Sequence, residues 1–270
     1  MRLRKYFCLI LFLTVCLGKS KAMYKELNSV CNGIGEKYIS EIRILDNKNL
    51  TSKEKDLIAG DWNAFLIALI CDQSVKEEVA WRLPYRLLER LGYLDLKKIV
   101  SEENSVKSLE LIIKKKPALH RFPKKVAEYI YSAMHDVVSI YNGNVSLIWK
   151  EDKNAGHVIE KLKKFKGISH KKAALGVLIL MRDFNLKFDN LEQVDIAADV
   201  HVTRVFSKMG LVENGAPELV VKKAREINPE FPGSLSSAFW VVGRNYCHSD
   251  KPNCDSCPFL KFCKAKSSMQ

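Results

Sequence analysis

Residues 157–182, HVIEKLKKFKGISHKKAALGVLILMR, have the pattern of two amphipathic helices joined by a tight turn. Apolar residues recur three and four positions apart on both sides of 166–169, which is helical spacing. Gly167 permits the turn, Ile168 can fill the gap between the helices, and Ser169 can cap the second helix. Backbone N–H groups at such a helix start can bind a phosphate group. The stretch therefore predicts a helical hairpin with a phosphate-binding turn.

Positive charge gathers around this turn and is in excess over the whole chain. The 270 residues carry a formal net charge of +13. Hydrophobic residues make up 47% and charged residues 28%, which is ordinary globular composition and excludes a disordered chain or one with many membrane spans. The excess predicts a polyanionic partner, either a nucleic acid or an anionic membrane surface. Six lysines flank the turn, at positions 161, 163, 164, 166, 171 and 172.

The rest of the chain is also helical in pattern, without the alternation that strands leave. Residues 62–72, WNAFLIALICD, are almost wholly apolar and predict a central core helix. We expect an all-α fold. Helical spacing also marks residues 78–91, 106–116, 124–141, 157–166, 171–182, 200–209, 216–227 and 235–246.

Four of the eight cysteines lie close together near the C-terminus. Cys247, Cys254, Cys257 and Cys263 are spaced C-x6-C-x2-C-x5-C. A [4Fe–4S] cluster needs four thiolates, one for each iron, and one short loop can supply them. A four-cysteine zinc site is the first competitor, although zinc modules more often use two C-x2-C knuckles. Two disulfides are the third reading. Cys31 and Cys71 have no such company and are predicted to be buried thiols.

Asp199 stands at the predicted start of the helix at 200–209. The ordinary role of an Asp at such a position is to cap the helix. Asp195, four residues earlier, is its rival for any acid role.

The N-terminal 22 residues look like a signal peptide, with a basic start and an apolar run from 6 to 18. They contribute +5, which leaves +8 for residues 23–270. The segment is a signal-like leader or a spurious extension before a start at Met23. An iron–sulfur loop belongs to a reducing compartment, so we favour a start at Met23 or an organellar leader over export.

Three stretches together resemble the helix-hairpin-helix DNA glycosylases, most closely endonuclease III. The hairpin FKGISHKKA at 165–173 is similar to the family's LPGVGRKTA, and DVHVTRV at 199–205 to its DTHxxRV. The cysteine loop from 243 to 263 matches in spacing and flanking residues. Upstream, residues 124–145 resemble the helix and turn before the family hairpin, and Gln73 sits where the family has a Gln after its early core helix. The resemblance covers roughly residues 55–266.

The resemblance implies two helical domains with a DNA-binding groove between them. It places a helical barrel domain at 54–193, with the hairpin at 157–182, and an iron–sulfur cluster domain at 23–53 and 194–270, leaving 1–22 outside both. The [4Fe–4S] cluster on Cys247, Cys254, Cys257 and Cys263 is expected to be structural.

The same resemblance implies base excision repair chemistry. Gln73 would fill the hole left by an extruded base, and Asp199 would stabilise positive charge on the sugar. Lys171 occupies the nucleophile position of glycosylases that also have AP-lyase activity. Lys172 points about 100° away from it on a helix and is expected to reach phosphate, as Gly167, Ser169 and Lys166 would.

The substrate implied is duplex DNA with a damaged base, oxidised pyrimidines first, or an abasic site, cut by a monomer located with intracellular DNA and not on a membrane. A monofunctional glycosylase for mismatched or modified bases and a non-catalytic DNA-binding iron–sulfur protein are the alternatives. This chain departs from the family pattern at Ser169 and Val200, and residues 183–193 form a longer connection that predicts an extra loop.

Overall fold

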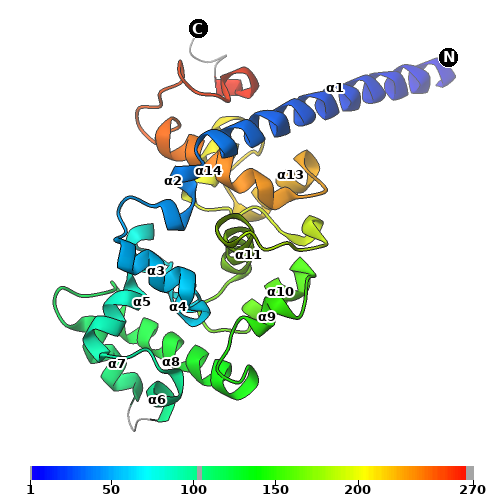
Figure 1. The fold of residues 1–270 in the computed structure, drawn as a ribbon. Coiled ribbons are helices and arrows are strands. Elements are labelled where there is room, and N and C mark those ends of the chain that lie inside the picture. The colour runs from blue at the N-terminus through cyan, green and yellow to red at the C-terminus, as the bar shows by residue number, and fades with distance from the viewer. Residues whose placement is uncertain (1, 102–104, 266–270) are drawn as a thin grey trace. The chain divides into compact units, whose positions relative to one another are not determined.

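The computed structural model describes residues 2–101 and 105–265 and divides into two compact units (Figure 1). We call Ser40–Asn190 the hairpin unit and Met1–Ile39 with Leu191–Gln270 the cysteine-loop unit. Throughout the described residues the regular elements are helices, and the pairing of Asn154 with Asp189 is an isolated bridge. The expected all-α class is confirmed.

The hairpin unit is built around α4 (Trp62–Cys71), whose residues 64–71 are all buried. This is the apolar helix predicted at 62–72, and it packs against α5 and α8. Gly176 lets α11 approach α4 closely, because a Cβ there would stand 2.8 Å from the Leu69 side chain. The other elements of this unit are α2 (Ile39–Ile42, which begins one residue before it), η1 (Ile44–Asp46), α3 (Ser52–Gly60), α5 (Glu77–Leu91), α6 (Leu96–Ser101), α7 (Ser105–Lys114), α8 (Pro123–Ile140), α9 (Leu147–Lys150), α10 (Ala155–Leu162) and α11 (His170–Phe184).

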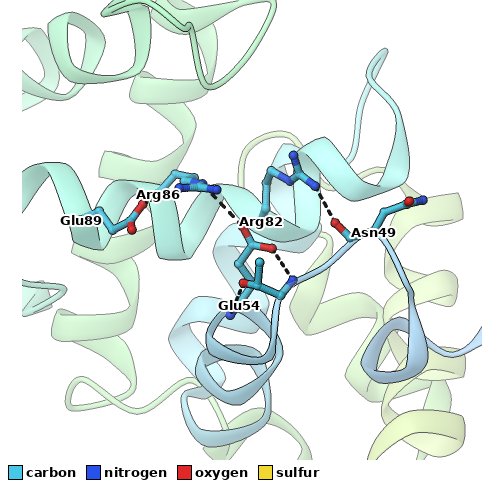
Figure 2. Close-up of polar contacts among 6 residues, drawn as sticks. Asn49, Glu54, Arg82, Arg86 and Glu89 are labelled. Atoms are coloured by element: carbon cyan, nitrogen blue, oxygen red, sulfur yellow. Dashed lines mark hydrogen bonds and ion pairs between the residues drawn. The ribbon is translucent and has the colours of Figure 1, made fainter.

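A polar network fastens the start of this unit to α5 (Figure 2). Thr51 and Glu54 form a capping box at the start of α3, in which each side chain bonds the other's backbone N–H. The Glu54 carboxylate, 1% exposed, also pairs with Arg86 at 3.5 Å. Arg82 donates to the Asn49 carbonyl at 2.6 Å. Two turns of α5 therefore hold the segment that leads into α3.

Residues 40–53 pack within the hairpin unit, whereas the domain bounds implied by the family resemblance group them with the cysteine loop. The cause is a contact between residues far apart in the chain. The buried Asp183 carboxylate accepts from the Leu45 backbone N–H at 3.1 Å, and Arg43 donates to the Asp183 carbonyl at 3.3 Å. The segment is thereby fixed to the end of α11.

The longer connection after α11 closes back on its own unit. α11 runs to Phe184, and Asn185 ends it in the left-handed conformation with φ +55°. Asp189 then donates to the Lys153 carbonyl at 2.8 Å and accepts from the Ala155 N–H at 3.0 Å. This part of the expected extra loop is therefore tied to the start of α10.

The cysteine-loop unit packs α12 and α1 against α14, and α1 also contacts α13. Within residues 20–37 of α1, Leu27, Cys31 and Ile34 are buried, and burial also raises the pKa of the Cys31 thiol. The elements are α1 (Arg2–Lys37), η2 (Leu191–Gln193), α12 (Val200–Lys208), α13 (Pro217–Ile227), η3 (Pro232–Ser234), α14 (Leu235–Asn245) and η4 (Leu260–Phe262).

The signal-like segment is the first part of α1, which continues into the packed residues without a break. Neither α1 nor any other helix in the described part of the chain is long and apolar enough to cross a membrane.

Candidate active site and cysteine loop

The turn between α10 and α11 is held in one conformation by packing on α8. Gly167 has φ +87°, a left-handed conformation that favours glycine. A Cβ at this position would also stand 2.4 Å from the Tyr129 ring. Ser169 caps α11, with its hydroxyl accepting from the Lys172 N–H at 3.4 Å. The side chains of Lys166 and Tyr129 line a cavity of about 360 Å³ beside the turn.

The two adjacent lysines of α11 have opposite surroundings. Lys171 is exposed to solvent in the first turn of the helix. Lys172 is only 6% exposed, and its ammonium donates to the Gly167 carbonyl at 2.8 Å and the Ile70 carbonyl at 2.7 Å. Burial lowers the pKa of Lys172 to about 8, opposed by the nearby Asp72 and Cys71. The phosphate contact expected of Lys172 has no support in this geometry, because its charge faces inward.

Gln73 lies just after α4, where several hydrogen bonds hold the end of the helix. Its side-chain amide donates to the Ile70 carbonyl at 3.3 Å, and its backbone N–H to the Cys71 carbonyl at 2.8 Å. His120, 2% exposed, bonds the same Cys71 carbonyl through Nε2 at 3.1 Å. The His120 Nδ1 accepts from the Phe122 N–H, which assigns the proton to Nε2. Burial lowers the pKa of His120, so the ring is neutral at pH 7.

Asp199 and Asp195 are clearly separated by their surroundings. Both oxygens of the buried Asp195 carboxylate are bound by the Arg225 guanidinium, at 2.7 and 2.8 Å. Asp199 is half-buried and caps α12, where Oδ1 accepts from the N–H groups of His201 and Val202, both at 2.9 Å. Within the described chain no hydrogen bond is made to the Asp199 Oδ2. Asp195 is therefore a structural ion-pair partner, and Asp199 keeps an oxygen for other chemistry.

The cysteine loop is anchored to the helix that Asp199 caps. Arg204 of α12 donates to the carbonyls of Cys247 and Gly243, at 2.7 and 2.6 Å. Lys208, one turn later, donates to the carbonyls of His248 and Ser249. Phe259 of the loop is 1% exposed and packs against Phe239, with the ring centroids 4.8 Å apart and the rings tilted by 50°. A single helix thus positions both the carboxylate and the first cysteine.

The four loop cysteines are free thiols and all are partly exposed. Burial raises the pKa of both Cys247 and Cys257, and the charges of the other loop cysteines raise them further. Lys208 and Arg204 act in the opposite direction on Cys247. Four thiols with cations beside them suit the donor set of an anionic iron–sulfur cluster. Within residues 2–101 and 105–265 no group of three or more His, Cys, Asp or Glu is placed to hold a metal ion. The thiolates that hold a [4Fe–4S] cluster lie farther apart than the ligands of a single metal ion, because each thiolate binds a separate iron.

The arrangement of helices is that of known DNA-bound enzymes. A trapped endonuclease III–DNA covalent intermediate (an estranged-adenine complex) superposes with a TM-score of 0.62 over 92% of this chain and 99% of that one, at 20% identity. This chain has the endonuclease III fold. A non-covalent endonuclease III–DNA complex gives 0.61 over 91% and 98%, at 19% identity. A thermostable thymine-DNA glycosylase gives 0.56 over 88% and 98%, at 14% identity.

Curated relatives named endonuclease III match the sequence itself. The protein of Rickettsia felis is 35% identical over 75 residues, which are 27% of this chain and 35% of the relative. That of Rickettsia conorii is 33% identical over 70 residues, 25% of this chain and 33% of the relative. These alignments thus span about a third of each relative's length. That of Thermotoga maritima is 23% identical over 190 residues, 66% of this chain and 81% of the relative. No family model matches the chain.

Three residues of this region were not singled out from the sequence. His120 carried no signal, because a lone histidine in a loop between helices has no distinguishing spacing. The ion pair of Arg225 with Asp195 joins residues 30 apart, which local patterns do not reveal. Arg204 belongs to the matched DVHVTRV stretch, and that position was the one available hint of its role.

Proposed function

We propose that this chain is a base excision repair DNA glycosylase with AP-lyase activity, acting on damaged bases in duplex DNA. Two observations carry the proposal, each made within one unit. Asp199 is a helix-capping carboxylate with one oxygen unclaimed by described residues, and Lys171 is an exposed amine beside a phosphate-binding turn. The endonuclease III fold supports assigning both to one reaction.

Asp199 supplies the negative charge for breaking the glycosidic bond. When the base departs with the bonding electron pair, positive charge develops on the sugar. Two backbone N–H groups donate to this carboxylate and fix its direction. Asp195 cannot take this part, because Arg225 occupies both of its oxygens.

Lys171 supplies the nucleophile of the lyase step. Its neutral amine attacks C1′ as the base leaves, and the proton that the amine gives up goes to the departing base. Opening of the sugar ring at the C1′–O4′ bond then gives an imine between Lys171 and C1′. Loss of a C2′ proton then breaks the bond from C3′ to the 3′ phosphate oxygen and nicks the strand. Water hydrolyses the imine and returns the amine. Lys172 is unsuited to the attack because its nitrogen is buried and bonded to two carbonyls.

Gln73, the turn and Lys166 bind the DNA in this proposal. The N–H groups at the start of α11, near Gly167 and Ser169, hold a phosphate, and Lys166 adds charge at the exposed surface. Gln73 fills the space that the extruded nucleotide leaves.

Cys247, Cys254, Cys257 and Cys263 would hold a [4Fe–4S] cluster. Its contribution is structural, since it would fix the loop that Arg204 and Lys208 attach to α12. The exposed Lys251 and Lys264 of the same loop would then face phosphate.

A monofunctional glycosylase is the second candidate, and the similarity to a thymine-DNA glycosylase favours it. In that case Lys171 contributes only charge. The two candidates are separated by duplexes that each carry one lesion, with thymine glycol first and a G·T mismatch and an abasic site beside it. We expect nicking at thymine glycol and at the abasic site without alkali. Nicking at a mismatched thymine that needs added alkali would support the monofunctional enzyme and contradict the lyase assignment.

A further inference from the structure

The buried ammonium of Lys172 joins two segments that the proposed function uses for different tasks. One is the turn at Gly167, which grips phosphate, and the other is the end of α4 at Ile70, which leads to Gln73. The two carbonyls belong to residues 97 positions apart in the sequence, and both bonds are shorter than 2.9 Å. Lys172 stands where the resembled family motif LPGVGRKTA has Thr. A Thr has no ammonium group, so this contact between the two carbonyls depends on the Lys of this chain.

Both ends of the link are otherwise well fixed. Gly167 is pressed against the Tyr129 ring and cannot shift toward it. On the other side, His120 holds the Cys71 carbonyl, and the Gln73 amide bonds the Ile70 carbonyl that Lys172 also bonds. The Lys172 ammonium thus bonds the same carbonyl oxygen as the side chain proposed to enter the duplex.

We propose that Lys172 is a positioning residue whose buried ammonium sets the place of Gln73 relative to the phosphate-binding turn. DNA gripped at the turn then meets Gln73 in one register. The inference rests on the proposed function, because it assumes that Gln73 enters damaged duplexes. Lys172 touches neither substrate nor reacting atoms and is not a catalytic residue.

The link depends on pH in the range where enzymes work. The pKa of Lys172 is lowered to about 8, chiefly by burial, so the ammonium is lost between pH 7 and 9. The groups that face it are Asp72 and Cys71 at the end of α4, Lys171 on its own helix, and the neutral His120. Burial raises the pKa of Cys71 to about 12, so this thiol stays protonated between pH 7 and 9.

The test measures how strongly the protein prefers an abasic-site analogue over undamaged duplex. The probe is a tetrahydrofuran-containing duplex, bound by the intact protein at pH 7. Lys172→Met should lower the preference roughly fivefold, the equivalent of one net hydrogen bond. Gln73→Ala should lower it too, and the double variant no further than Gln73→Ala alone. Lys187→Met, at an exposed lysine of the same unit, is the matched control and should change nothing.

A pH series separates positioning from general stability. From pH 7 to pH 9 the preference of the parent should fall to that of Lys172→Met, with a midpoint near pH 8, while Lys172→Gln stays level. Lys172→Gln also serves if the Met variant does not fold. Additive effects of Lys172→Met and Gln73→Ala would overturn the inference and leave the proposed function standing. A preference of the parent that does not change from pH 7 to pH 9 would do the same. A parent protein with no preference for the analogue and no nicking of any lesion would overturn the proposed function, and the inference with it.

Discussion

Burying the Lys172 ammonium should leave a measurable signature in the stability of the hairpin unit. The perturbation is a change of pH from 7.0 to 8.5, in the parent and in Lys172→Met. A lysine with pKa 10.5 in the unfolded chain and about 8 in the folded one binds fewer protons when folded across this range. The free energy of unfolding therefore rises with pH, and the contribution of this group is lost again as pH falls.

The magnitude follows from these two pKa values. The difference of about 2.5 units corresponds to about 3 kcal/mol by which the ammonium destabilises the fold at pH 7, relative to the neutral amine. The side chain is 6% exposed, so solvent screening does little to reduce this figure. Between pH 7.0 and 8.5 about 1 kcal/mol of that cost is relieved.

The assay is urea unfolding followed by tryptophan fluorescence under anaerobic conditions. Three of the four tryptophans, Trp62, Trp81 and Trp149, lie in the hairpin unit, so the signal reports mainly on it. The free energy of unfolding of the parent should rise by about 1 kcal/mol relative to that of Lys172→Met over this range. Lys171→Met, which removes the exposed neighbour, should keep the gain. Parallel profiles for the parent and Lys172→Met would refute the reasoning.

The other predictions concern the site and its loop. Asp199→Asn keeps the helix cap, since Asn also caps, and should slow base release about a hundredfold with DNA binding retained; equal rates in single-turnover release would reject the charge role. Asp195→Asn removes the charge that pairs with Arg225 and should destabilise the fold by about 1–2 kcal/mol. The cost stays small because Arg225 is half exposed and water can solvate it, and the folded variant should keep its activity in the same assay. Purified protein should be yellow-brown with about four irons per chain, lost in Cys257→Ser; a colourless zinc protein by elemental analysis would rule out the cluster. Lys166→Ala should reduce the slope of log affinity against log salt by about one, and an unchanged slope would remove Lys166 from the phosphate contacts.

Most of the fold could be read from helical spacing. The bounds of the nine predicted helices lie within four residues of observed ones, because each helix buries a continuous apolar stripe. α3 was not predicted, since SKEKDLIAG has too few apolar positions to form such a stripe. Its Thr51–Glu54 capping box was the available signal.

The position of residues 40–53 and the inward direction of Lys172 depend on contacts that no local pattern contains. The Asp183 carboxylate accepts a hydrogen bond from the backbone N–H of Leu45, which is 138 positions away in the sequence. Helix geometry separated Lys172 from Lys171 by about 100°, but it did not indicate whether that direction led to solvent or to the core. Lysines are seldom fully buried, so the outward direction was the natural expectation.

The lyase assignment of Lys171 is tested most directly by borohydride trapping on abasic duplex DNA. The reductant converts the imine between the amine and C1′ into a stable bond, so the parent should form a covalent protein–DNA complex. Lys171→Ala should form none, while Lys172→Met, which removes the buried neighbour, should still form it. Trapping that persists in Lys171→Ala, or a parent that cannot be trapped, would contradict the account.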